Sequence, residues 1–155
     1  MKKFLVKSYL KILAKFSNGK GYAQKFPILK KFVNTIESSL KSDFVEFFGG
    51  KMYLDSNDSM GLSIRGVYGP ASTRFVLENV KIGNAVVDLG AHIGYYSLIL
   101  AKLVGKEGKV FSFEPVPKNF SKLEKNIKLN NYSNVIAENM AISNFNGKTE
   151  LFVSQ

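Results

Sequence analysis

The stretch Ala85-Val-Val-Asp-Leu-Gly-Ala-His-Ile-Gly-Tyr-Tyr-Ser97 decides the fold class of this chain. Its first residues form a short apolar run that is typical of a buried parallel strand. Asp88 ends that run, and Gly90 and Gly94 allow the backbone to turn tightly. Residues 95–104 then predict a helix. A strand, a glycine turn and a helix in this order can hold a nucleotide-like ligand at the carboxyl end of a parallel sheet.

The acid at the strand end favours one kind of ligand over another. A dinucleotide-binding loop offers backbone amides and a helix N-terminus to a pyrophosphate, which a carboxylate would repel. S-adenosylmethionine has no phosphate and carries an ammonium and a sulfonium group, so Asp88 is favourable for it. The turn by itself leaves an alternative open, namely an ordinary strand-to-helix turn with a capping aspartate.

A second acid, Glu114, follows 26 residues after Asp88. Residues 109–113 alternate in polarity and favour a strand, Pro115 stops it, and Pro117 can begin a helix over residues 118–130. A carboxylate at the end of this second strand is placed to accept both hydroxyls of a ribose. The alternative is that Glu114 caps the following helix. Two acids at consecutive strand ends favour a bound nucleoside.

At this point the sequence resembles the FkbM family of S-adenosylmethionine-dependent methyltransferases, from roughly Val67 to Val153. The resemblance rests on the glycine-turn stretch and on these further segments: Gly66-Val-Tyr-Gly-Pro70, Phe113-Glu-Pro115, Asn126, Asn130, Ala141-Ile-Ser143 and Gly147-Lys-Thr-Glu-Leu151. It implies an α/β fold, the Rossmann-like doubly wound sheet of class I methyltransferases. It also implies S-adenosylmethionine as the cofactor, lying across the carboxyl ends of the strands.

The resemblance also implies which residues bind this cofactor. Asp88, Gly90, Ala91 and Gly94 would line its methionine portion, and Glu114 would hold its ribose. The full set of cofactor-binding candidates is Tyr68, Thr73, Asp88, Gly90, Ala91, His92, Gly94, Glu114, Pro115, Asn139 and Met140. No catalytic residue is assigned.

The remaining candidates of this set depend more on the family pattern. Asn139 and Met140 follow the third strand and would approach the adenine. His92 stands where the family more often has Asn; it can cap the helix or donate to the cofactor, and a structural role is favoured over that of a general base. Tyr68 and Thr73 match the family pattern and could touch the cofactor, although simple packing under the sheet explains Tyr68 equally well.

The predicted sheet is incomplete at its C-terminal side. A doubly wound sheet of this class has about six or seven strands, whereas this chain offers three parallel strands and one further strand before Gln155. The family's Ile-Asp-Val-Glu-Gly-like run at the end of the fourth parallel strand is absent. We therefore expect residues 85–87 to form an open, apolar edge that invites association. We interpret the chain as the cofactor-binding half of a methyltransferase; the alternative is a complete small protein with a reduced role.

The charge of the chain is concentrated near its beginning. Residues 1–31 hold nine lysines and no acid, whereas the rest holds 13 basic against 12 acidic residues, out of a net charge of +10. A nearly neutral domain argues against nucleic acid as the main substrate. Residues 2–16 predict a basic amphipathic helix, which could contact an anionic membrane surface or, as we favour, pack against the protein with its lysines in water. The chain has no cysteine and one histidine, so we expect no disulfide and no metal site.

The segment between the basic helix and the glycine turn predicts a helical and β-hairpin region. Pro27 begins a helix through about residue 40, and Gly49-Gly50 is a two-residue hairpin signal between strands at 44–48 and 51–54. Residues 55–61 predict a polar loop, and residues 70–80 a helix. We thus divide the chain into a basic helical extension (1–41), a hairpin and helix cap (42–80) and the first half of the cofactor-binding domain (81–155).

These observations predict a cytoplasmic methyltransferase, present as its cofactor-binding half, with peripheral membrane contact through residues 2–16 as a further expectation. No apolar run is long enough to span a membrane, and a signal peptide is not indicated. The family resemblance implies O-methylation of a hydroxyl on a sugar, glycan or small natural product. Two alternatives remain: a nicotinamide-binding domain, which would have a third glycine and no acid at the strand end, and a non-catalytic basic module that docks on membranes or acidic partners.

Overall fold

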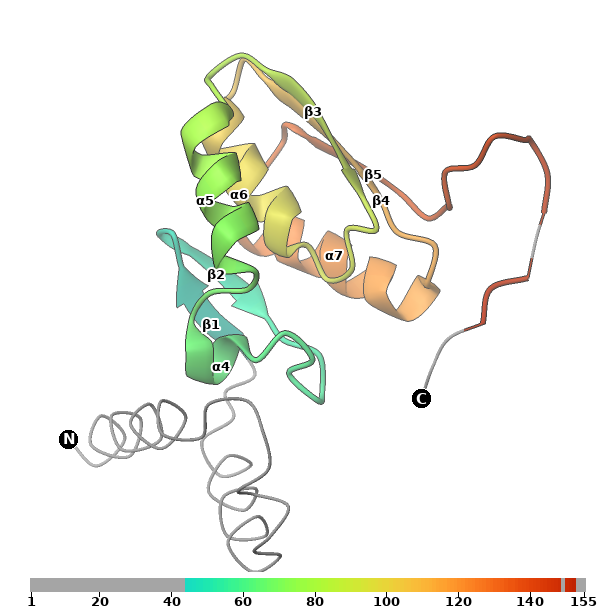
Figure 1. Cartoon of the computed structure of the whole chain (residues 1–155), viewed down its shortest axis with the longest axis horizontal. Helices are drawn as coiled ribbons and strands as arrows, with labels where there is room; N and C mark the ends of the chain where they lie inside the picture. Colours follow the sequence, from blue (N-terminus) through green and yellow to red (C-terminus); the bar gives the residue numbers. More distant parts are fainter. Residues whose placement is uncertain (1–43, 149, 153–155) are drawn as a thin grey trace, which may run out of the picture.

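The computed structural model describes residues 44–148 and 150–152, which form a β-hairpin followed by a parallel sheet with helices packed against it (Figure 1). The expected basic helix at 2–16 with its membrane contact, and the helix at 27–40, lie outside the described residues and stay predictions. Within the described part, no helix is long and apolar enough to cross a membrane, and no group of acidic and histidine side chains could hold a metal ion.

Three parallel strands make the sheet: β3 (Ala85–Leu89), β4 (Lys109–Phe113) and β5 (Val135–Glu138), in the order β3-β4-β5. All three are rich in β-branched or aromatic residues, which fit a pleated surface. β4 lies at the centre, with Ala85 opposite Lys109 and Val110 opposite Val135. β3 is therefore an edge strand in the described part, as expected from the missing neighbour.

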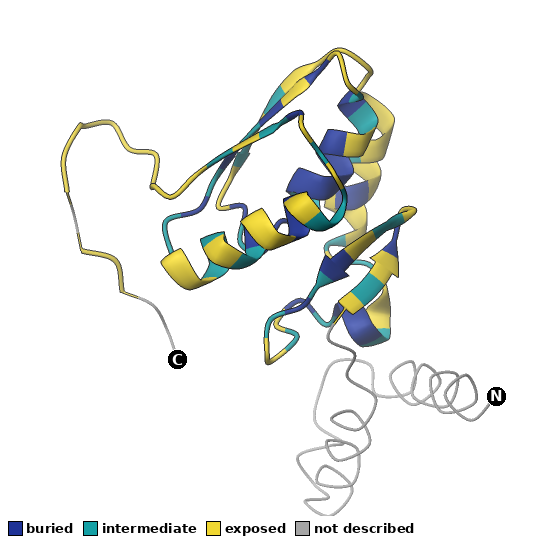
Figure 2. Cartoon of the chain, turned by 180° about the vertical axis from the view of Figure 1, so that it is seen from behind, coloured by how far each residue is buried: buried dark blue, intermediate teal, exposed yellow. Residues whose placement is uncertain are grey.

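The helices lie on one face of this sheet (Figure 1). These helices are α5 (Pro70–Asn79), α6 (Tyr95–Val104) and α7 (Pro117–Leu129). Val110 and Ser112 of β4, which face the helices, are fully buried, whereas Val87 and Leu89 on the opposite face of β3 are 59% and 62% exposed. Figure 2 shows the same contrast, with blue helix surfaces turned toward the sheet. The described residues thus cover one side of a sheet whose two faces are both apolar.

The hairpin packs on the helices rather than on the sheet. Its strands β1 (Phe44–Phe47) and β2 (Gly50–Tyr53) are antiparallel. Phe47 stacks on Tyr95 of α6 with ring centroids 5.5 Å apart, and Met52 is fully buried in the same hydrophobic cluster as Leu123 of α7. One core therefore holds the hairpin, α6 and α7 together.

The hairpin turn differs by one residue from the prediction. Phe47 pairs with Gly50, so the two turn residues are Phe48 and Gly49, both with positive φ (46° and 75°), and not Gly49-Gly50. This is the left-handed pair that a tight two-residue turn needs. Gly50 instead begins β2 at a point where a Cβ would lie 2.8 Å from Oδ1 of Asn130. The second glycine serves this close approach of α7 and not the turn.

The other predicted elements agree with the structure to within two residues. α6 and β4 have the predicted bounds, and β3 extends two residues further, so that Asp88 lies within the strand. The short helix α4 (Leu62–Arg65) was not predicted; Asp58 caps it by accepting hydrogen bonds from the backbone N–H groups of Leu62 and Ser63. The expected further strand after β5 is absent from residues 141–148 and 150–152, because nothing in the described part pairs with this segment.

The conclusion that only one face of the sheet is covered can be tested by making the same Val→Thr substitution on each face. Val110→Thr puts a hydroxyl into a fully buried site and should lower the free energy of unfolding by about 1–3 kcal/mol. Val87→Thr, on the exposed face, should change it by less than about 0.5 kcal/mol. Urea denaturation of both variants measures the difference. Equal losses would mean that both faces are covered in solution.

Candidate functional site

The turn between β3 and α6 is wound from residues in the left-handed backbone region. Gly90, His92 and Gly94 have φ values of 76°, 53° and 101°. Glycine adopts this region freely, but a histidine there costs about 1–2 kcal/mol. The turn is tied to the neighbouring strand, because the N–H groups of Gly90 and Ala91 both donate to the carbonyl oxygen of Phe113, at 2.9 and 3.0 Å.

Gly94 is required by space as well as by its φ. A Cβ at this position would lie 2.8 Å from Cδ1 of Leu123, a fully buried residue of α7. Because Leu123 is confined in the core, it has little room to move away. The glycine therefore lets α7 pack directly beneath the turn, and the pattern Gly-x-x-x-Gly at 90–94 fixes both the turn and its support.

Glu114 lies at the end of β4 and spans the gap between two loops. Its side chain is buried, and Oε2 accepts a hydrogen bond from the N–H of His92 at 2.8 Å, while Oε1 accepts one from the N–H of Val116 at 2.9 Å. Asn119 lies at the limit of bonding distance, 3.5 Å from Oε1. An ionised carboxylate has about four acceptor positions, so room remains for the hydroxyl donors of a ribose.

Asp88 has a different environment from Glu114, although both stand at neighbouring strand ends. Its Oδ2 accepts a hydrogen bond from Ser97 Oγ of α6 at 2.6 Å, and Ser97 in turn accepts one from Ser112 of β4 at 2.9 Å. Burial raises the pKa of Asp88, hydrogen bonds from Ser97 act in the opposite direction, and the charge of Glu114 raises it further. Asp88 therefore faces the helix layer through a chain of buried hydroxyls.

An acid in the loop that follows the hairpin senses the charge of His92. Burial raises the pKa of Asp55 in that loop, but hydrogen bonds from Ser59 and Asn57 and the proximity of His92 outweigh this effect, so that the pKa is lowered overall. The carboxylate of Asp55 accepts hydrogen bonds within its own loop, from the N–H of Asn57 and from the side chain of Ser59. This agrees with the polar loop predicted for residues 55–61.

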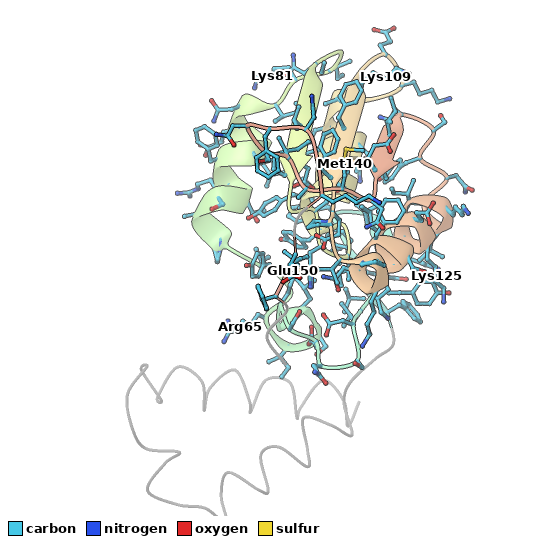
Figure 3. All side chains as sticks on the ribbon, turned by 90° about the vertical axis from the view of Figure 1, so that its right-hand side faces the viewer. Arg65, Lys81, Lys109, Lys125, Met140 and Glu150 are labelled. Atoms are coloured by element: carbon cyan, nitrogen blue, oxygen red, sulfur yellow. The ribbon has the colours of Figure 1, made fainter. Side chains whose placement is uncertain are left out.

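Asn139 connects the loops that follow β4 and β5. Its Nδ2 donates to the carbonyl oxygens of Glu114 and Pro115, at 2.7 and 3.2 Å. Met140, the next residue, is 47% exposed and lies where the chain leaves the sheet (Figure 3). The structure thus brings Glu114, Pro115 and Asn139 into contact and leaves the Met140 side chain accessible at the same edge.

Tyr68 and Thr73 lie at the other side of the turn, around Tyr95. Thr73 is buried, and its Oγ1 donates to the carbonyl oxygen of Tyr68 at 2.7 Å and lies 3.3 Å from the hydroxyl of Tyr95. The ring of Tyr68 is 45% exposed and packs edge-on against Tyr95 and Tyr96. Thr73 thus holds the segment in place, and of the two only Tyr68 presents a surface to a ligand.

Two polar residues beside the site, Ser97 and Asn126, were given no role from the sequence. Both are fully buried and hydrogen-bonded. An asparagine inside a helix is a weak signal, because its side chain competes with the backbone for hydrogen bonds. A serine near a helix start is too common to point to a buried carboxylate.

The burial of Asp88 has a consequence for stability that can be measured. The pKa of Asp88 is higher in the folded state than its value of 3.8 in the unfolded chain. The contribution of Asp88 to the free energy of unfolding is therefore fully present below pH 3.8 and is lost as the pH rises through the folded-state pKa. Asp88→Asn removes this loss, so the free energy of unfolding of the variant relative to the original chain should increase as the pH rises above 3.8. Ser97→Ala removes the hydrogen bond that favours the ionised form and should steepen the loss. A uniform decrease for Asp88→Asn at every pH would contradict this account.

Comparison with known proteins gives these features a family. Residues 68–151, more than half of the chain, match the TRM5/TYW2 methyltransferase domain. A protein-L-isoaspartate O-methyltransferase of Archaeoglobus fulgidus is 26% identical over 72% of this chain and 52% of its own length. A second such enzyme, from Methanococcus aeolicus, is 35% identical over 37% of this chain and 26% of its own length. The chain thus spans between a quarter and about half of the length of these curated relatives.

The solved structures agree with this result. TYW2 of Pyrococcus horikoshii, in complex with MeSAdo, is 31% identical and matches 68% of this chain and 39% of its own length with a TM-score of 0.51. The comparisons support the methyltransferase class, the Rossmann-like fold and the cofactor, but they do not show the FkbM family. The chain belongs to the TRM5/TYW2 methyltransferase domain family.

Proposed function

We propose that this chain binds S-adenosylmethionine between the glycine turn and Glu114, as the cofactor-binding part of a methyltransferase. The observation that supports this most directly is the position of Glu114. It is a buried carboxylate at a strand end, 2.8 Å from the turn amide of His92, and it keeps unused acceptor positions. A ribose diol can donate to such a group, whereas a pyrophosphate would be repelled by it.

The site residues have distinct roles in this proposal. Glu114 accepts the ribose hydroxyls, the backbone of residues 90–94 lies along the methionine portion, and Asp88 adds negative charge at the neighbouring strand end. Met140 and Asn139 approach the adenine, with Met140 supplying apolar surface and Asn139 holding the loop in position. Pro115 shapes the same loop, and Tyr68 offers an exposed aromatic ring on the other side of the turn.

The bound sulfonium would supply an activated methyl group, so the protein has to align an acceptor atom and accept its proton. None of the described residues is assigned as that base. We propose oxygen as the acceptor atom. A hydroxyl of a sugar or small natural product is the acceptor that the FkbM resemblance implies, and a carboxylate is the acceptor that the name of the isoaspartate relatives implies.

Nucleic acid is a third acceptor class to be tested. The nearly neutral charge of residues 32–155 argued against nucleic acid, but the comparisons give that exclusion no support. Incubation of the chain with tritiated cofactor and either glycans, isoaspartyl peptide or RNA separates these classes by which substrate retains the label. A nicotinamide-binding domain is disfavoured by the family match and by Asp88 at the strand end.

Cofactor binding is tested by calorimetry on the full chain. Glu114→Gln replaces one carboxylate oxygen with an NH2 group, which cannot accept from the N–H of His92 or Val116. It should weaken S-adenosylmethionine binding about 10- to 100-fold, which corresponds to a loss of about 1–3 kcal/mol in binding free energy. Asp88→Ala should weaken it to a similar extent.

The matched control is Glu124→Gln, which removes the same charge from an exposed position on α7 and should leave the affinity unchanged. Circular dichroism of each variant confirms that it is folded. If the folded original chain releases no heat with S-adenosylmethionine, or if Glu114→Gln binds it as tightly as Glu124→Gln does, the proposed site is wrong.

A further inference from the structure

A buried asparagine on α7 connects the hairpin to the glycine turn. Asn126 is completely buried, and each of its polar atoms is used. Oδ1 accepts a hydrogen bond from the N–H of Tyr53 at 2.7 Å, and Nδ2 donates to the carbonyl oxygens of Tyr53 and Ile93, at 3.1 and 2.8 Å. One side-chain amide therefore joins a strand of the hairpin, a helix and the cofactor turn.

Asn130 bonds the hairpin in the same way as Asn126 does. Asn130 accepts from the N–H of Lys51 at 2.8 Å and donates to the carbonyl oxygen of Lys51. Four residues of a helix rise about 6 Å, and two residues of a strand rise about 6.6 Å. The two asparagines therefore match alternate residues of β2 and pair with that edge as a neighbouring strand would. Lys125, labelled in Figure 3, adds a contact, with its Nζ 4.1 Å from the ring centroid of Tyr53.

Only Asn126 extends this pairing to the turn. The peptide between Ile93 and Gly94 is held at both ends: its carbonyl accepts from Asn126, and its N–H donates to the carbonyl of Ala91 at 2.8 Å. The orientation of this peptide sets the direction of the backbone at the start of α6. Asn130 donates instead to the carbonyl of Asn126 and makes no bond to the turn.

We propose that Asn126 is a positioning residue for the cofactor, which couples the hairpin to the glycine turn through the Ile93–Gly94 peptide. The inference rests on the proposed function, because it requires that the turn binds S-adenosylmethionine. Without the Asn126 amide, the Ile93–Gly94 peptide is no longer held in one orientation. The cofactor then has to order the turn as it binds, and this cost lowers its affinity. Coupling of this kind is reciprocal: cofactor binding should in turn stabilise the bond to Tyr53.

The matched pair Asn126→Ala and Asn130→Ala tests this in the full chain. Each loses the two hydrogen bonds to one residue of β2, but only Asn126→Ala also loses the bond to the turn. We expect Asn126→Ala to weaken S-adenosylmethionine binding about three- to tenfold by calorimetry, and Asn130→Ala to change it less than about twofold. Equal loss in both folded variants would make Asn126 merely structural and would overturn the inference.

A measurement on the unsubstituted chain covers the case in which Asn126→Ala does not fold. Amide hydrogen exchange should slow at Tyr53 when S-adenosylmethionine is added, and slow less at Lys51, whose N–H bonds Asn130. Equal slowing at both amides would overturn the inference.

Failure of cofactor binding itself can be told apart from failure of this coupling. If the original chain binds no S-adenosylmethionine, the proposed function is wrong, and so is the role of Asn126 in cofactor affinity. The coupling between the hairpin and the turn is then measured without cofactor, by amide hydrogen exchange at Gly94. Faster exchange in Asn126→Ala than in Asn130→Ala supports the link between hairpin and turn, and equal exchange refutes it.

Discussion

The structure depends on a turn that would not hold its conformation alone. Three of the five residues from Gly90 to Gly94 lie in the left-handed backbone region, and one of them is a histidine. Two buried side chains compensate for this cost. Glu114 holds the N–H of His92, and Asn126 holds the carbonyl of Ile93, the next residue along the chain. Because these groups come from β4 and α7, the turn acquires its shape only when the sheet and the helices are assembled around it.

This arrangement explains why the hairpin belongs to the same core as the helices. Met52 is buried in the cluster that contains Leu123, while Asn126 on the same helix bonds the backbone of Tyr53. Apolar contacts give the hairpin its stability on α7, and the asparagines fix its register, because each amide can pair with only one residue of the strand. The opposite face of the sheet receives nothing comparable from the described residues, and there Val87 and Leu89 stay exposed.

The elements that depend on local pattern could be predicted from the sequence. Prolines at 70 and 117 begin α5 and α7, and the apolar run and the alternating run gave β3 and β4. The hairpin turn could not be placed to the residue, because Gly49 and Gly50 look alike in sequence and differ only in that Asn130 approaches one of them. The same holds for Asn126, whose partners lie 73 and 33 residues away.

The two acids show why a pattern of strand-end carboxylates is an incomplete guide to a site. Asp88 lies inside β3, where alternation along the strand turns its side chain toward α6 and the hydroxyl of Ser97. Glu114 lies one residue beyond the end of β4, on the same buried side as Val110 and Ser112, and its carboxylate accepts a hydrogen bond from the turn amide of His92. Asp88 stands one residue before the end of β3 and Glu114 one residue after the end of β4. This shift of two residues takes the carboxylate from the hydroxyl of Ser97 on α6 to the N–H of His92 in the glycine turn. In the proposed site, Glu114 accepts the ribose hydroxyls, whereas Asp88, bonded to Ser97, acts on the cofactor through its charge.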